Sequence, residues 1–122
     1  MKILRLDHVQ LAIPPGAENA ARSFYSGILG LDEVPKPTPL AHRGGCWFKS
    51  GDVQIHAGVE EDFHPAKKAH PALVVEDLDA IVARCQAAGL PTKPEADFAG
   101  FRRVHIFDPF GNRIELMEFA KS

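Results

Sequence analysis

The chain has 122 residues, of which 45% are hydrophobic, and a formal net charge of −2. This is the length of one domain with enough apolar side chains for a core. The near-neutral charge argues against binding to nucleic acid or an anionic membrane surface. The opening run MKILRLDHVQLAIPPG is interrupted by polar residues, so it is neither a signal peptide nor a membrane span, and we expect a cytoplasmic protein.

The first half predicts one helix and four strands. Alternation predicts a strand over residues 6–13, and helical spacing predicts a helix over 17–29 that Gly30 ends. Three short strands are predicted at 31–34, 45–49 and 53–58, with a proline-rich loop between the first two. The order of elements is βαβββ.

The second half repeats this order. A strand is predicted over 70–75, followed by a helix capped by Asp77 and ended by Gly89. Strands are then predicted at 92–93, 104–107 and 113–119, the last two joined by a tight turn in DPFGN. We therefore expect an α+β fold of two tandem βαβββ modules in a single domain, 1–122, with module one at about 1–62 and module two at about 66–122.

Four side chains that can bind a metal occupy equivalent positions in the two halves. Aligning the helix ends places His56 on Glu115 without a gap, and aligning the opening strands places His8 on His70. Any one of these histidines alone is more often a surface or hydrogen-bonded core residue. The coincidence of four favours a metal site, for which histidine nitrogens and a carboxylate suit Zn, Fe(II), Mn, Ni or Co.

Neighbouring polar residues are candidates for substrate binding. Strand alternation places Gln10 on the face of His8, and Arg113 on the face of Glu115. Arg103, placed just before the penultimate strand, shares a face with His105 and can bind a carboxylate or phosphate, although a solvated arginine is the alternative. Trp47 is interpreted as a core or dimer-packing residue.

Several motifs together match a known family: LDHVQLAI, ARSFYSGILGL, HPALVVEDLDAIVARCQAAGL and DPFGNRIELME. The chain resembles the vicinal oxygen chelate superfamily, which includes glyoxalase I, fosfomycin-inactivating thiol transferases, bleomycin-binding proteins and extradiol dioxygenases. The resemblance implies a cupped mixed sheet around a divalent metal, with the cup completed in a homodimer. It places metal ligands at His8, His70 and Glu115, with His56 at a fourth position that glyoxalase I usually fills with glutamate.

The resemblance implies a metal-dependent glyoxalase-like enzyme of lyase, isomerase or transferase type. It would act on a small molecule chelated through adjacent oxygens, with Glu115 or His56 alternating between metal ligand and general base. Two alternatives remain open. One is a non-catalytic protein that sequesters a small molecule or antibiotic, and the other is a small extradiol-type dioxygenase.

Overall fold

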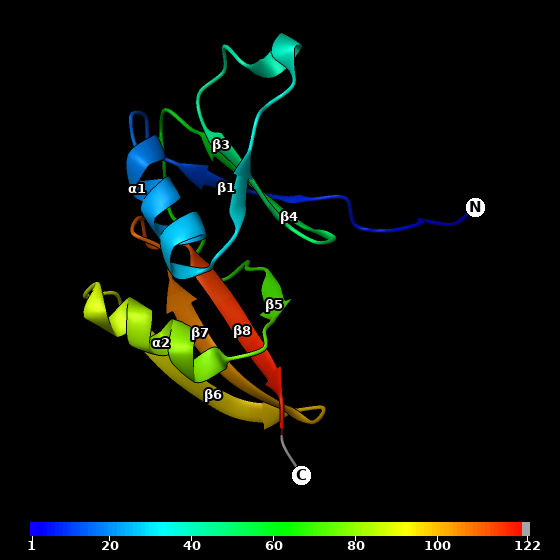
Figure 1. Ribbon diagram of the computed structural model, residues 1–122, viewed down its shortest axis with the longest axis vertical. Coiled ribbons are helices and arrows are strands. Elements are labelled where there is room, and N and C mark those ends of the chain that lie inside the picture. The colour runs from blue at the N-terminus through cyan, green and yellow to red at the C-terminus, as the bar shows by residue number, and fades with distance from the viewer. Residues whose placement is uncertain (121–122) are drawn as a thin grey trace. The chain divides into compact units, whose positions relative to one another are not determined.

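The computed structural model describes residues 1–120 and divides into two compact units, Met1–His64 and Pro65–Ser122. Residues 121 and 122, the end of the second predicted module, lie outside the described part. Each unit holds a four-stranded mixed sheet with helix packed against it, so the predicted α+β fold of two βαβββ modules is confirmed (Figure 1). That the units form one domain stays a prediction. No helix among residues 1–120 has both the length and the apolarity needed to span a lipid bilayer.

The first unit has strand order β1-β4-β3-β2, with β1 parallel to β4 and the other pairs antiparallel. The predicted opening strand begins three residues late, because sheet pairing starts only at Val9 and Leu6 is 74% exposed. His8 therefore precedes the strand. The elements are β1 (Val9–Ile13), α1 (Glu18–Arg22), η1 (Ser23–Ile28), β2 (Asp32–Val34), η2 (Thr38–Leu40), β3 (Cys46–Ser50) and β4 (Val53–Val59).

The predicted first helix consists of two parts, since α1 continues into a π-helical turn, η1. The helix ends at Gly30, as predicted, with a φ of +77° that favours glycine. The Leu31 N–H donates to the Tyr25 carbonyl at 3.0 Å, one residue further back than at a regular α-helix end. The wider turn seats two consecutive aromatic rings, Phe24 and Tyr25, in the core.

The second unit has strand order β5-β8-β7-β6, with β5 parallel to β8. Its helix begins as predicted, because the Asp77 side chain accepts a hydrogen bond from the Ala80 N–H at 3.1 Å. Its strand β5 is shorter than predicted, so that His70 precedes the strand as His8 does in the first unit. The elements are β5 (Ala72–Val74), α2 (Leu78–Ala87), β6 (Thr92–Phe98), β7 (Phe101–Phe107) and β8 (Arg113–Phe119).

The hairpin of β6 and β7 is longer than predicted. The strand predicted at 92–93 stops before Pro94, which cannot donate a hydrogen bond, but β6 continues through this residue because it is an edge strand, in which proline is tolerated. The strands meet at a two-residue turn whose Ala99 and Gly100 both have positive φ. As a result Arg103 lies inside β7, where its side chain has a fixed direction, and the prediction that it precedes the strand was wrong.

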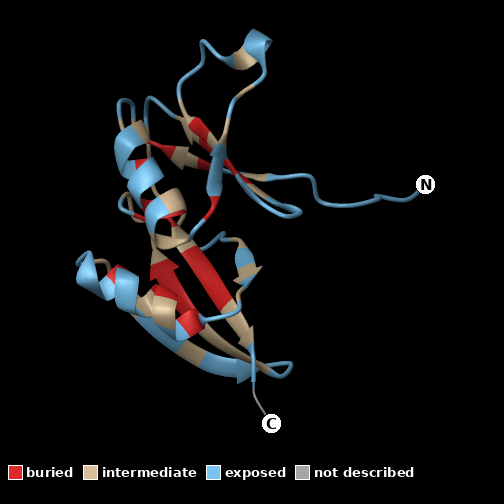
Figure 2. Ribbon diagram, in the orientation of Figure 1, coloured by how far each residue is buried: buried red, intermediate tan, exposed pale blue. Residues whose placement is uncertain are grey.

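Each face of the second sheet has its own chemistry. Ile114 and Leu116 are fully buried and belong to the core that α2 covers, and Figure 2 shows the buried stretches along β7 and β8. Burying an aliphatic side chain of this size stabilises the fold by about 1.5–3 kcal/mol. Glu115 alternates with them and lies on the opposite face, which explains a carboxylate within an apolar run.

Candidate metal centre

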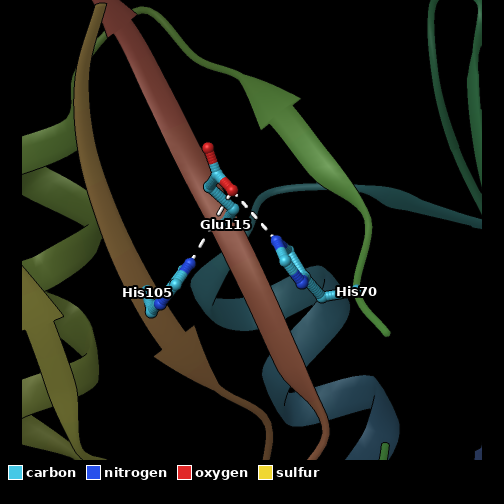
Figure 3. Close-up of side chains that lie close together, drawn as sticks. All are labelled: His70, His105 and Glu115. Carbon is cyan, nitrogen blue, oxygen red and sulfur yellow. Dashed lines mark hydrogen bonds and ion pairs between the residues drawn. The ribbon is translucent and has the colours of Figure 1, made fainter. Parts of the chain in front are cut away.

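Three ligand-type side chains of the second unit converge on the sheet face opposite α2. Glu115 comes from β8, His105 from β7, and His70 from the segment just before β5; Figure 3 shows them pointing toward one another. One potential ligand atom from each lies within 4.8 Å of the others. The sheet register causes this convergence, because Glu115 pairs with Ala72 on one side and with His105 on the other.

The Glu115 carboxylate is the centre of the cluster. Its Oε1 lies 2.9 Å from His70 Nε2 and 3.7 Å from His105 Nε2, while Oε2 accepts a hydrogen bond from Arg103 Nη1 at 3.1 Å. Burial raises the pKa of this carboxyl, but the contacts with His70 and Arg103 outweigh it and hold the pKa below its usual value. Glu115 is therefore an anion at neutral pH.

His70 is oriented so that Nε2 faces the Glu115 carboxylate. Its Nδ1–H donates to the Lys68 carbonyl oxygen at 2.8 Å, since a carbonyl can only accept. With Nδ1–H bonded to Lys68, the approach of Nε2 to Glu115 Oε1 requires a positive charge between the two atoms, either a proton on Nε2 or a metal ion. Two ligand atoms at about 2.1 Å from a metal, at about 90°, lie roughly 3 Å apart. The separation therefore fits a shared metal ion, and the Lys68 contact is typical of a metal-binding histidine.

His105 is a member of the cluster that the sequence analysis did not select. It is buried, and neither ring nitrogen has a hydrogen-bond partner, although Nδ1 lies 3.1 Å from Glu95 Oε1. Burial lowers the pKa of this imidazole, which keeps it neutral. A buried, neutral imidazole without a hydrogen bond, beside a carboxylate, fits a metal ligand.

The gapless alignment of the two halves is shifted by one residue at β7, so it did not place His105 opposite Glu115. The β7–β8 turn is one residue longer than the β3–β4 turn, since Asp108 bonds to Asn112 whereas Ser50 pairs directly with Val53. The gapless alignment is therefore wrong for β3 and β7. In register, the counterpart of His105 is Trp47, which pairs with His56 as His105 pairs with Glu115.

The first unit brings His8 and His56 together in an aromatic stack. The His56 ring lies between His8 and Trp47, at centroid distances of 4.1 and 4.0 Å. Its Nε2 is buried without a hydrogen-bond partner, and burial, followed by the nearby His8, lowers its pKa. His8 Nδ1 lies 3.0 Å from Asp7 Oδ2. His56 is thus a neutral imidazole with an unused nitrogen.

Comparison with known proteins identifies the family. The model of the Glyoxalase/Bleomycin resistance protein/Dioxygenase superfamily matches residues 5–116. The chain belongs to this superfamily. The resemblance inferred from the motifs is therefore confirmed.

Solved structures of the superfamily share the fold. A glyoxalase family protein from Bacillus anthracis is 45% identical, with a TM-score of 0.89 and 98% of each chain covered. The fosfomycin resistance protein FosX from Listeria monocytogenes, in complex with Mn(II) and sulfate, is 19% identical, with a TM-score of 0.75 and 99% of this chain and 93% of that chain covered. A search of curated proteins gave no match.

The superfamily positions predicted to bind metal fall in both units. His70 and Glu115 are in contact in one unit, and His8 and His56 in the other. Each unit is described by itself, so the convergence of all four on one ion stays a prediction.

The predicted substrate-binding residues lie on the corresponding sheet faces. Arg103 contacts Glu115 directly. The Arg113 guanidinium lies 6.0 Å from the Phe107 ring centroid, with a buried Nε that has no hydrogen-bond partner. Gln10 is next to His56 in the sheet register. Their roles in binding remain predictions.

The depressed histidine pKa values predict an acid-sensitive fold. Because burial lowers the pKa of His56 and His105, the unfolded chain binds more protons than the folded chain just below about pH 6.5. Their contribution to stability is present above that pH and is lost as pH falls. We expect the metal-free protein to have a lower Tm at about pH 5.5 than at about pH 7.5.

Thermal melts of variants check the source of this effect. His105→Gln is expected to reduce the Tm difference, and His64→Gln, which changes an exposed histidine, is expected to leave it unchanged. A wild-type Tm that does not fall with pH, or an unaltered difference in His105→Gln, would contradict the assignment.

Proposed function

We propose that the protein is a metal-dependent enzyme of glyoxalase-like type, a lyase, isomerase or transferase, that acts on a small molecule with adjacent oxygen atoms. The observation that carries the proposal is the cluster of His70, His105 and Glu115, in which His105 and Glu115 are buried and His70 Nε2 lies 2.9 Å from Glu115 Oε1. Such a donor set is suited to a divalent ion. When bound, the ion would act as a Lewis acid toward paired substrate oxygens.

The residues of the second unit have separate roles in this proposal. His70 and Glu115 would hold the ion, and His105 would provide a further nitrogen from the neighbouring strand. Arg103 binds Oε2 of Glu115 and thereby leaves Oε1 directed at the two histidines. Its other anchor, a hydrogen bond from Nε to the Ala96 carbonyl at 2.9 Å, fixes the guanidinium. Arg103 therefore positions the carboxylate as well as facing substrate.

The first unit is proposed to supply His8 and His56 to the same ion, within a homodimer. The repeat equivalence of these residues to His70 and Glu115 supports this part of the proposal. His56 suits either ligation or proton transfer, because it is neutral and its Nε2 is unbonded. Glu115 is the alternative base, and Gln10 and Arg113 would contact the substrate.

Metal analysis tests the proposal directly. Protein purified without chelator, or titrated with Mn(II), Ni(II), Co(II), Zn(II) and Fe(II), is expected to bind a divalent ion stoichiometrically. His70→Ala is expected to lose most of the bound metal while keeping the far-UV circular dichroism spectrum of the wild type. His64→Ala, which removes an exposed histidine outside the cluster, is the control and should retain the metal.

Two further variants address the first unit. If His8→Ala and His56→Ala also lower occupancy, the predicted four-residue site is supported. Absence of metal from the wild type, with no affinity for any of the five ions, would contradict the enzyme proposal and favour a protein that sequesters a small molecule.

A further inference from the structure

A cavity of about 390 Å³ in the first unit lies beside the stacked imidazoles and has no place in the metal chemistry above. Two cationic side chains, Lys36 and Arg43, line it together with the Gln10 amide and the Trp47 indole. We propose that this cavity binds an oxyanion group of the substrate, a carboxylate, phosphate or phosphonate. The assignment to substrate rests on the proposed function, whereas anion binding itself does not.

The charged residues that line the cavity are all cationic, and the Glu18 carboxylate, which interacts electrostatically with Lys36, lies outside the lining. No carboxylate is among its lining residues, and in residues 1–120 neither Lys36 nor Arg43 has a carboxylate within ion-pair distance. By contrast, Arg22 pairs with Glu33 at 2.9 Å, and Arg103 pairs with Glu115 at 3.1 Å. Two cations that line one cavity and have no direct ion pair favour binding of an anion, through charge-assisted hydrogen bonds.

The loop that carries the cations is held in shape. The Lys36 ammonium donates hydrogen bonds to the backbone carbonyls of Arg43 and Gly44, which closes residues 36–44 into a ring. At the base of the loop the Gly45 N–H donates to Glu18 Oε2 at 3.1 Å. These bonds leave the Arg43 guanidinium free of protein hydrogen bonds in the described part of the chain, with all its donors available.

Trp47 connects the cavity to the candidate centre. The indole lines the cavity and also stacks on His56, with an interplanar angle of 6°. An anion held by Arg43 would therefore lie one aromatic ring away from an imidazole proposed to bind metal or accept a proton. This replaces the interpretation of Trp47 as a simple packing residue, and it assigns the cavity to the end of the substrate remote from the paired oxygens.

Fluorescence provides a direct test, since Trp47 is the only tryptophan of the chain. Metal-free protein is titrated with inorganic phosphate, methylphosphonate or acetate, with chloride added to keep the ionic strength constant. A saturable change in Trp47 emission is expected for at least one of these anions. Arg43→Gln should weaken the apparent affinity by about tenfold, which is the loss expected for one charge-assisted contact.

Lys49→Gln is the matched control. It removes the same charge from an exposed position on the same strand as Trp47 but outside the cavity, and should titrate like the wild type. A response to phosphate and methylphosphonate alone identifies a tetrahedral anion as the ligand class, and a response to acetate identifies a carboxylate. The absence of a saturable change, or equal affinities in Arg43→Gln and the wild type, overturns the proposal.

The test is separate from that of the metal centre. His70→Ala should still give the Trp47 response after it has lost metal, because His70 is not part of the cavity. Loss of metal binding in the wild type with retention of the anion response would contradict the enzyme proposal and leave the anion site standing.

Discussion

Replacing Glu115 with glutamine is expected to lower the affinity for divalent metal by about 100-fold or more. Loss of a residue that only hydrogen-bonds to a metal ligand lowers metal affinity by about 10–100-fold, and loss of the ligand itself should cost more. Glu115 is the only carboxylate in the cluster of His70, His105 and Glu115. The substitution leaves two imidazoles and an amide as possible ligands. The amide has nearly the same shape as the carboxylate. The substitution also leaves Arg103 without its anionic partner, and the uncompensated positive charge of Arg103 further disfavours binding of a cation.

The control for this variant is Glu33→Gln. Glu33 is exposed and pairs with Arg22 in the first unit, so its substitution changes the net charge equally without touching the cluster. Affinities are measured by calorimetry or by competition with a chromophoric chelator, and circular dichroism monitors the fold. Equal affinities in the Glu115 and Glu33 variants would remove Glu115 from the ligand set and, with it, the central argument for the site.

The sequence pattern predicted the helix ends and strand faces well, because these features depend on residues that are close together in the sequence. The Asp77 cap and the glycine ends of both helices depend on a few consecutive residues, and both are present in the structure. Alternation likewise identified Glu115 as facing away from its aliphatic neighbours. The lengths of β6 and β7 were missed because Pro94 is acceptable only on an edge strand, and strand order is not contained in a local pattern.

The candidate site was predicted only in part, for a reason of register. His70 and Glu115 emerged from the repeat, but His105 did not, because one additional residue in the β7–β8 turn shifts the pairing of the two halves. Strand register is a long-range property, and a one-residue error moves a side chain to the opposite face. The signal available was the shared face of His105 and Arg103.

The anion cavity depends on a loop conformation that the sequence pattern did not reveal. The stretch PKPTPLAHRGG reads as a proline-rich connection, and nothing in it specifies that Lys36 bonds to the carbonyls near Arg43. The pair Gly44 and Gly45 was the available hint. Consecutive glycines often mark a close approach of two backbones, and here they lie against β4.

Replacing Gly45 with alanine is expected to destabilise the protein by about 3 kcal/mol or more. Gly45 has a φ of +101°, a conformation that residues with a Cβ rarely adopt, and an added Cβ would lie 2.1 Å from the Ala57 carbonyl oxygen. Relief of this clash requires movement of strand backbone at the end of the β3–β4 pairing, because Ala57 is paired with Cys46, the first residue of β3. The loop bearing Lys36 and Arg43 should move with it.

Gly51→Ala is the matched control for the conformational part of this cost. Gly51 also has positive φ, +57°, but an added Cβ there meets nothing within 4 Å. Its substitution should cost about 1 kcal/mol, the usual penalty for the left-handed region. Urea unfolding measures both free energies. If the two variants unfold within about 1 kcal/mol of each other, the approach of Gly45 to Ala57 is not the constraint we infer. If Gly45→Ala folds but loses the Trp47 response, the loop conformation itself is required for anion binding.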